Sequence, residues 1–362
     1  MNQNVCRESD LERFLRAALA AGGADTDSAE AAARAMMHAS RLGVDSHGLR
    51  LLPHYLKVLA GGRVNPRPKM KIHARAQATA WLHADHGLGH LAGYTAMAEA
   101  VRLAEGCGIG AVAVGNSSHF GAAGAYALAA AEAGCIGLAV CNSDSIVQLF
   151  DGVMAFHGTN PLALAAPLPE GPPYLIDMAT SSIPWNRVLQ YAALDQELPA
   201  DVVVDEAGQT TTDGAAAKAL KPLGADYGYK GAALAGMVEI LSAALTGMAI
   251  SFQVPAMMGP DFSTPRRLGQ FFLALRPEAF VPREDYESQM TDYLTALRAQ
   301  PAVENGEVLA PGDREWREAE HRREFGIPID NANRRTFDEI AQRLRIEPLK
   351  VESGLGAETP GI

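Results

Sequence analysis

Three side chains capable of proton transfer and anion binding lie close together near residue 47. Ser46, His47 and Arg50 bring a hydroxyl, an imidazole and a guanidinium into one short segment. An imidazole exchanges protons near neutral pH, and a guanidinium grips a carboxylate through two parallel hydrogen bonds. The segment therefore predicts a site that moves a proton on a small organic acid.

A second histidine and a lysine are further candidates for such a site. His119 precedes glycines that open a predicted helix, so the amides of its neighbours could face a phosphate. Lys230 lies between glycines just ahead of another predicted helix, where its ammonium could reach phosphate or ribose hydroxyls. The spacing of His83, His86 and His90 could suggest a metal, but nothing nearby would orient such ligands, and we expect no metal site.

Helical and strand-like segments that would position these residues follow one another along the whole chain. Ser9 and Glu12 form a predicted capping box for a first helix, which the glycines at 22 and 23 end. Further helices are predicted over residues 26–42, 50–60, 88–105, 121–133, 231–250, 283–299 and 335–345, and a highly charged one over residues 313–325. Strands are predicted over residues 70–73, 78–84, 111–114, 136–141, 161–167, 174–178 and 268–275. The Gly- and Glu-rich end, residues 352–362, is expected to form no packed element.

A glycine motif in the first half of the chain raises the question of a Rossmann fold. The segment Gly87-Leu88-Gly89-His90-Leu91-Ala92 lies between a predicted strand and a predicted helix, which is the context that the dinucleotide fingerprint requires. The next strand should then end in an acidic residue that binds the ribose. It ends instead in Val114-Gly115-Asn116-Ser117. We therefore interpret these glycines as turn residues.

Composition and charge narrow the class of protein. The chain has 362 residues, 48% apolar and 20% charged, and a net charge of −11 without basic clusters. A nucleic-acid or anionic-membrane surface requires clustered Lys and Arg, so we expect neither partner. The four cysteines lack paired spacing, the N-terminus is polar, and we find no apolar stretch of about 18 residues. These features predict a cytoplasmic protein without a transmembrane helix.

Several separated stretches resemble, in order, the motifs of one enzyme family. They are Asp45-Ser46-His47-Gly48, Ser118-His119-Phe120-Gly121 with the residues to Tyr126, Asn142-Ser143, residues 158–163, Asp177-Met178-Ala179 with the next two residues, Gly228-Tyr229-Lys230-Gly231, and Pro311-Gly312-Asp313. The chain resembles the malate/L-lactate dehydrogenase family that is distinct from the Rossmann-type enzymes. This family includes ureidoglycolate and L-sulfolactate dehydrogenases and Δ1-piperideine-2-carboxylate reductase. The resemblance extends from about residue 10 to 345.

The resemblance implies a fold, a reaction and an assembly. The expected fold is an α/β, L-sulfolactate dehydrogenase-like architecture with a mostly antiparallel central sheet flanked by helices. The expected division is an N-terminal helical unit (1–70), a sheet and dimerisation portion (71–115), a cofactor-binding domain (116–280) and C-terminal helices (281–362) that complete the first unit. The expected activity is NAD(P)-dependent interconversion of a small 2-hydroxy acid and its 2-oxo acid, in a homodimer, with NAD expected over NADP. A cyclic-imine reductase and a non-catalytic cofactor-binding relative are the alternatives.

The resemblance also assigns roles to residues. His47 with Ser46 is the expected proton-transfer pair, and His119 is expected to touch substrate or nicotinamide, or to act as the proton acceptor itself. Arg50 is the expected carboxylate ligand, although many members carry this arginine four positions after the histidine, where this chain has Leu51. The residues expected to line the cofactor are Phe120, Gly121, Ser143, Asp177, Met178, Ala179, Lys230, Pro311, Gly312 and Asp313. Arg187, a cation where imine-reducing members carry an acid, favours hydroxy-acid chemistry.

Overall fold

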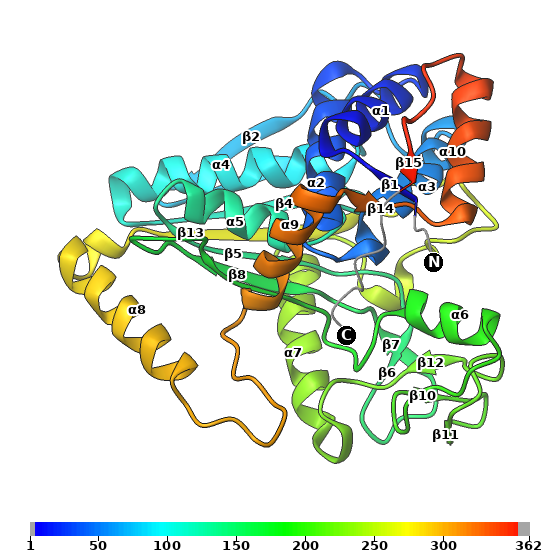
Figure 1. The fold of residues 1–362 in the computed structure, drawn as a ribbon. Helices are drawn as coiled ribbons and strands as arrows, with labels where there is room; N and C mark the ends of the chain where they lie inside the picture. Colours follow the sequence, from blue (N-terminus) through cyan, green and yellow to red (C-terminus); the bar gives the residue numbers. More distant parts are fainter. Residues whose placement is uncertain (1–3, 354–362) are drawn as a thin grey trace.

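The computed structural model describes residues 4–353 and contains three sheets surrounded by helices (Figure 1). Helices α1 to α10 span Glu8–Ala21, Thr26–Arg41, Leu52–Ala60, Gly89–Cys107, Gly124–Glu132, Trp185–Ala193, Tyr229–Glu239, Arg283–Arg298, Asp313–Phe325 and Asn331–Leu344. The short helical segments η1 to η6 span Asp45–His47, Leu49–Leu51, Ala225–Tyr227, Ile240–Ala244, Ser251–Gln253 and Pro277–Ala279. Strands β1 to β15 span Asn4–Cys6, Lys71–Ala76, Thr79–His83, Ile109–Ser117, Ile136–Cys141, Val147–Gln148, Ala155–His157, Leu162–Ala166, Tyr174–Met178, Val203–Val204, Thr210–Thr211, Ala219–Leu220, Leu268–Leu275, Ile327–Pro328 and Glu352–Ser353.

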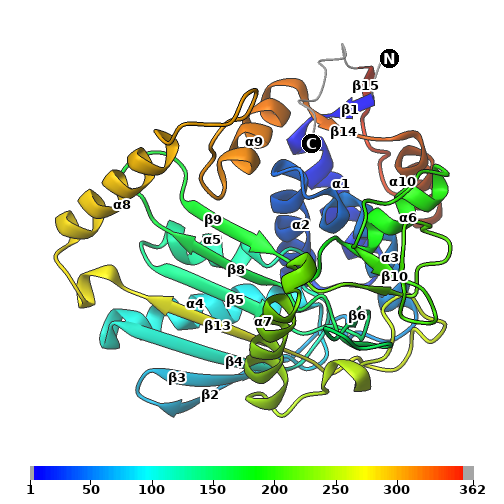
Figure 2. The same ribbon diagram turned by 90° about the horizontal axis from the view of Figure 1, so that it is seen from below.

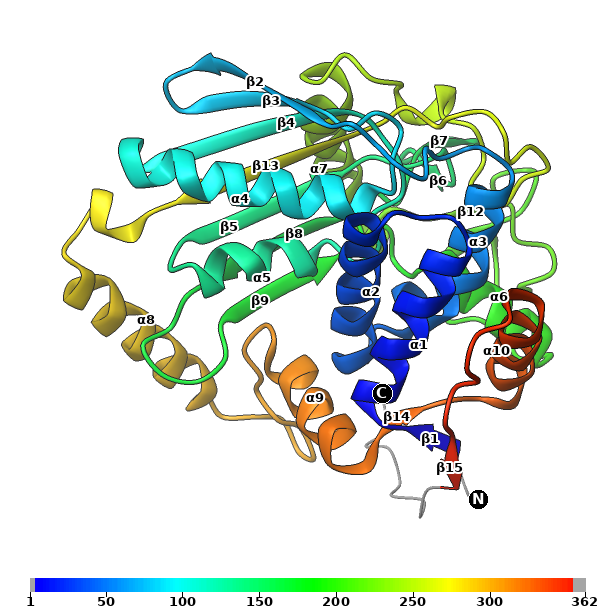
Figure 3. The same cartoon turned by 90° about the horizontal axis from the view of Figure 1, so that it is seen from above.

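The largest sheet has seven strands in the order β2-β3-β4-β13-β5-β8-β9. All its neighbouring strands are antiparallel except β3 and β4. Side chains alternate between buried and half-buried along β4 and β13, as expected for strands whose two faces differ in cover. Helices α4 and α5 pack on one face, and α7 crosses the other (Figures 2 and 3). The predicted α/β fold with a mostly antiparallel sheet flanked by helices is confirmed.

Helices from the two ends of the chain gather at one side of this sheet. In α1, Leu11, Phe14, Leu15 and Leu19 form a continuous buried face, which is why the segment is helical and packed. This face belongs to an apolar cluster that also includes residues of α2, α3 and α10. Strand β1 pairs with both β14 and β15, so the N-terminal segment lies between two C-terminal ones (Figure 3).

Two expectations about helix ends are wrong, and one falls mostly outside the described residues. Ser9 lies inside α1, which begins at Glu8 after an N-cap Arg7 without a side-chain cap. The helix expected over residues 231–250 ends as an α-helix at Glu239, continues as the π-helical η4, and stops before Gly247, whose φ is +71°. The expectation that residues 352–362 form no packed element is wrong for Glu352–Ser353, which form β15 and pair with β1, and beyond Ser353 it lies outside the described part of the chain.

A smaller five-stranded sheet, β11-β10-β12-β6-β7, lies beside α6 and has its own apolar cluster (Figure 1). Its strands have two or three residues each, which is too short for a periodic pattern to be read from the sequence. None of the described helices is long and apolar enough to cross a membrane.

Candidate active site

The Asp-Ser-His segment forms the short helical turn η1 between α2 and α3. Its first residue, Asp45, receives both Nη atoms of Arg322 from α9, at 2.6 Å and 3.1 Å. Gly48 ends the turn against Ser40, where a Cβ would lie 2.4 Å from the serine Oγ. The same Oγ accepts the backbone N–H of Leu49 at 3.0 Å. The turn is therefore held at both ends, and residues 46 and 47 project from a fixed backbone.

His47 and His119 lie together although 72 positions separate them in the sequence. Their rings stack with centroids 5.9 Å apart and an interplanar angle of 21°. Ser46 Oγ lies 2.9 Å from His47 Nδ1, within hydrogen-bond distance. The structure thus brings together the residues that the sequence predicted for proton transfer.

Burial keeps both imidazoles neutral near physiological pH. It lowers the pKa of His47 to about 4. The pKa of His119 is lowered well below its ordinary value, first by burial and then by the neighbouring His47, His54, Arg266 and His90. A neutral imidazole has one nitrogen that accepts a hydrogen bond and one that donates. Each neutral ring therefore carries one proton on one nitrogen and can accept another proton on the other nitrogen.

The loop that carries His119 leaves β4 and is fastened to the start of α4. Ser118 Oγ donates to the carbonyl of Gly87 at 2.8 Å and accepts the N–H of Gly89 at 2.9 Å. A Cβ on Gly89 would lie 2.2 Å from the Ser118 carbonyl oxygen. Gly89 therefore allows this loop to approach the helix closely. Gly87 lies in a turn, as predicted, whereas Gly89 is already the first residue of α4.

Two residues that the sequence did not single out as site residues complete the surroundings of His119. The hydroxyl of Tyr55, from α3, lies 2.9 Å from His119 Nδ1. The ring of His90 packs edge-on against Tyr55 with centroids 4.6 Å apart. Helical spacing marks both as buried positions, but no pattern in the sequence joins α3 and α4 to the loop after β4.

Arg50 has a protein partner in this structure. Its Nη2 lies 2.9 Å from Oδ2 of Asp330, the N-cap residue of α10, and its side chain is 48% exposed. The ion pair is solvent-exposed, and such pairs are weak, at about 0–1 kcal/mol. A substrate carboxylate can therefore compete for this guanidinium at small cost.

The residues expected around the cofactor fall into three groups. Asp177 lies at the end of β9, where its Oδ2 accepts the N–H of Gly124 at the start of α5 at 2.9 Å, and burial raises its pKa to about 7. The amide that might have met a phosphate at this helix start is therefore taken by a carboxyl group. Met178 and Ala179 follow, half-buried. The main chain of Phe120 and Gly121 belongs to the His119 loop, while the Phe120 ring is buried against Tyr126.

Lys230 and the Pro311–Asp313 turn are the second group, and Ser143 is the third. Lys230 is exposed in the first turn of α7, with its Nζ 5.2 Å from the ring centre of Tyr227. The carbonyl of Pro311 accepts the N–H of Leu175 on β9 at 3.4 Å, which places that turn against the strand that leads to Asp177. Asp313 is bound by Arg298 through two hydrogen bonds of 2.9 Å and 2.7 Å.

Ser143 is held by a buried polar network that the sequence did not reveal. Its N–H donates to Asn160 Oδ1 at 3.2 Å, and its Oγ accepts the N–H of Thr159 at 3.0 Å. Behind them, the carboxyl group of Glu239 accepts from Asn160 Nδ2 at 2.8 Å and from both the N–H and the Oγ of Ser251 at 2.7 Å. Glu239 lies in a segment that the sequence predicts to be an apolar helix. Its carboxyl group holds Asn160, which in turn binds the N–H of Ser143.

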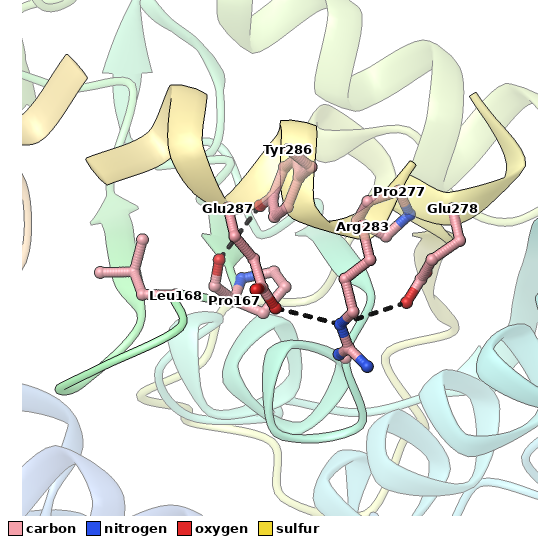
Figure 4. Close-up of a pocket in the computed structure, with 8 residues that line it drawn as sticks. Pro167, Leu168, Pro277, Glu278, Arg283, Tyr286 and Glu287 are labelled. Atoms are coloured by element: carbon pink, nitrogen blue, oxygen red, sulfur yellow. Dashed lines mark hydrogen bonds and ion pairs between the residues drawn. The ribbon is translucent and has the colours of Figure 1, made fainter. Parts of the chain in front are cut away.

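Lys230 lies at the positive end of α7, beside the ring of Tyr227. The carboxyl group of Asp177 is bonded to the main chain at the start of α5. Among the described residues, no group of three or more His, Cys, Asp or Glu side chains could hold a metal ion. A pocket lined by Pro167, Glu278 and Tyr286 lies at α8 (Figure 4), and α8 lies on the opposite side of the molecule from α3 (Figure 1).

Comparison with known proteins identifies the class to which this non-Rossmann α/β fold with its stacked histidines belongs. Residues 6–337 match the family model described as malate/L-lactate dehydrogenase. The chain is 34% identical to malate dehydrogenase of Pyrococcus abyssi, in an alignment of 363 positions that covers 97% of this chain and 98% of the relative. It is 32% identical to ureidoglycolate dehydrogenase (NAD(+)) of Escherichia coli, in an alignment that covers 85% of this chain and 87% of the relative. It is 34% identical to (2R)-3-sulfolactate dehydrogenase (NADP(+)) of Chromohalobacter salexigens, in an alignment that covers 84% of this chain and 89% of the relative. The chain belongs to the malate/L-lactate dehydrogenase family.

Solved structures agree with this assignment. Malate dehydrogenase of Pyrococcus horikoshii superposes with a TM-score of 0.87 at 31% identity, covering 95% of this chain and 97% of that one. Δ1-piperideine-2-carboxylate reductase of Pseudomonas syringae superposes with a TM-score of 0.84 at 29% identity, covering 93% and 99%. The predicted family, and with it the predicted class of NAD(P)-dependent 2-hydroxy-acid dehydrogenases, is confirmed.

Proposed function

We propose that His47 exchanges the hydroxyl proton of a small 2-hydroxy acid while the hydride passes between C2 of the acid and the nicotinamide. The stacked pair of neutral imidazoles, with Ser46 bonded to one of them, is the observation that supports this role. In oxidation, the C2–H bond breaks with its electron pair, the O–H proton moves to His47 Nε2, and the C2=O bond forms. His47 Nδ1–H then donates to Ser46 Oγ, which keeps Nε2 free as the acceptor.

The negative charge of the substrate is expected to raise the pKa of His47. A pKa near 4 leaves His47 unprotonated and able to accept a proton, but it makes the imidazole a weak base. A bound carboxylate nearby favours the protonated imidazole and raises its pKa toward the working pH. Reduction of the 2-oxo acid needs that protonated form, so the same residue serves both directions. We propose that the substrate carboxylate replaces Asp330 as the partner of Arg50. This ion pair would orient C2 of the substrate for hydride transfer.

The cofactor is proposed to lie along Ser143, Asp177 with the two residues that follow it, Lys230 and the Pro311–Asp313 turn, beside the main chain of Phe120 and Gly121. When bound, it supplies or takes the hydride. Lys230 would neutralise phosphate charge, and the Ser143 segment would give it polar groups held rigid by Glu239. We propose NAD over NADP. We also propose cytoplasmic location, consistent with four free cysteines.

A homodimer is proposed as the assembly. The outer face of α7 and η4 carries an apolar stripe that includes Leu234, Met237, Ile240 and Leu245, with Ile240 64% exposed. Contiguous exposed apolar surface of this kind marks an interaction site. Light scattering should give twice the chain mass, and Ile240→Glu should reduce it to the monomer mass, whereas Val303→Glu, at an exposed position between α8 and α9, should not.

The activity is tested with a panel of 2-oxo acids and cyclic imines, with NADH and NADPH, following the absorbance of the reduced cofactor. His47→Ala should lower kcat by at least about a hundredfold with unchanged cofactor affinity, and His73→Ala, an exposed histidine of β2, should not. Wild-type turnover by His47→Ala would move proton transfer to His119. Turnover of imines alone would indicate the reductase alternative, and cofactor binding without any turnover would refute the enzyme proposal.

A further inference from the structure

The hydrogen bonds at His119 define which of its nitrogens carries the proton. The backbone N–H of Gly121 donates to His119 Nδ1 at 3.4 Å. A backbone N–H cannot accept, so Nδ1 must be the unprotonated nitrogen. The Tyr55 hydroxyl, 2.9 Å from the same Nδ1, must then be a donor as well. Because the ring is neutral, its one proton lies on Nε2.

The surroundings of Tyr55 favour its hydrogen bond to His119 Nδ1. It is 1% exposed, and burial raises the pKa of its phenol far above the ordinary value, so the hydroxyl keeps its proton. Its ring is held edge-on by His90, which is fully buried and has no hydrogen-bond partner among the residues that the structure describes. This packing fixes the direction of the hydroxyl toward Nδ1.

We propose that Tyr55 is a positioning residue that holds His119 as the Nε2–H tautomer, so that His119 donates a hydrogen bond to the reacting substrate oxygen. This inference rests on the proposed function and assigns a separate role to each of the two histidines. His47 moves the proton, and His119 stabilises the negative charge that develops on the oxygen during hydride transfer. A preorganised neutral donor in a dry site is effective in this role because it needs no reorganisation when the charge appears. His119 cannot serve as the proton acceptor at Nε2 while that nitrogen carries its own proton.

The tautomer can be measured without substrate or turnover. Long-range proton–nitrogen correlation NMR of protein labelled at the histidine nitrogens separates a protonated nitrogen from an acceptor nitrogen, and the spectrum of His119→Gln identifies the signals. We expect His119 to show an acceptor Nδ1 and a protonated Nε2 at neutral pH. A protonated Nδ1 would overturn the proposal. Because this readout does not require activity, it is independent of whether the proposed reaction is correct.

Kinetics test the role of Tyr55. Tyr55→Phe keeps the ring against His90 and removes the donor. We expect kcat to fall by roughly tenfold to a hundredfold, about 1.4–2.8 kcal/mol, with unchanged cofactor affinity. The acidic limb of the pH profile should also move to higher pH, because Nδ1 becomes easier to protonate. Tyr286→Phe, which loses a tyrosine hydroxyl bonded to the Pro167 carbonyl at 3.1 Å near α8, is the matched control (Figure 4). A Tyr55→Phe enzyme with wild-type kcat and pH profile would refute the positioning role.

Substitutions of His119 itself separate a donor from a base. A glutamine side chain supplies an N–H donor and no base. His119→Gln should therefore retain clearly more activity than His119→Ala if His119 only donates. Equal loss in the two variants, with both folded, would show that His119 is the proton acceptor and would overturn the proposal.

Discussion

Arg322 is the residue whose removal best tests how the proton-transfer turn is held. It is 4% exposed, and its guanidinium makes two hydrogen bonds to Asp45, one to Glu318 at 2.5 Å and one to the Ser40 carbonyl at 2.7 Å. We therefore predict that Arg322→Met destabilises the protein and also slows catalysis, because Asp45 begins the turn that carries His47.

The magnitude follows from the burial of the partners. Removing one member of a buried ion pair costs about 3–5 kcal/mol, since the other charge is left uncompensated. The Asp45 side chain is 34% exposed and can be partly rehydrated, which lowers the expected cost to about 2–4 kcal/mol. A shift of the turn by an ångström is enough to cost about a hundredfold in rate, so we expect kcat to fall by about tenfold to a hundredfold.

The assay is urea unfolding followed by tryptophan fluorescence, together with steady-state kinetics at saturating cofactor. Arg323→Met is the matched control on the same helix, because its side chain is 74% exposed and its contact with Glu320 is 3.6 Å long. That variant should change stability by less than about 1 kcal/mol. The reasoning is refuted if both variants lose equal stability. It is also refuted if Arg322→Met is destabilised yet keeps the wild-type kcat.

Three further predictions concern the cofactor segment and the buried histidines. Lys230→Ala should weaken cofactor binding by roughly tenfold, about 1.4 kcal/mol, in a calorimetric titration, and an unchanged affinity would remove Lys230 from the cofactor site. Glu239→Gln should lower the free energy of unfolding by about 1–3 kcal/mol, because its amide would oppose the N–H of Ser251; a neutral result in urea unfolding would contradict this. His38 is buried with a pKa lowered to about 4 from 6.5, by burial first and then by nearby arginines. The unfolded chain therefore takes up the proton first as the pH falls, and the protein should lose about 2 kcal/mol from His38 between pH 6.5 and about pH 5. His38→Gln should flatten that part of the stability profile, and an unaltered slope would contradict the assignment.

Sequence reasoning succeeded where composition within one segment is distinctive. The apolar strand over residues 268–275 and the highly charged helix over residues 313–325 are observed with the expected bounds. The ordered set of short motifs between Asp45 and Asp313 was sufficient to identify the family. Each of these signals lies within one continuous stretch of chain.

The contacts that tune the site could not be read in the same way. Tyr55 and His119 are 64 positions apart, and Asp45 and Arg322 are 277 apart. Such pairs depend on how sheets and helices pack, which a single sequence does not specify. Glu239 shows the limit most clearly, because a charged residue in an apolar helix gives no sign of the four groups that donate to it, which are Asn142 Nδ2, Asn160 Nδ2 and the N–H and Oγ of Ser251.

The pairing of β1 with β14 and β15 has a consequence for biosynthesis. The turn with His47 is made early on the ribosome, but Arg322 and the strands that enclose β1 are made near the end. Because the N-terminal helices complete their apolar cluster with α10, a nascent chain that stops before residue 313 exposes that cluster and has no partner for Asp45. Catalytic competence is therefore acquired in a single late step of synthesis, and incomplete chains remain inactive targets for chaperones and proteases.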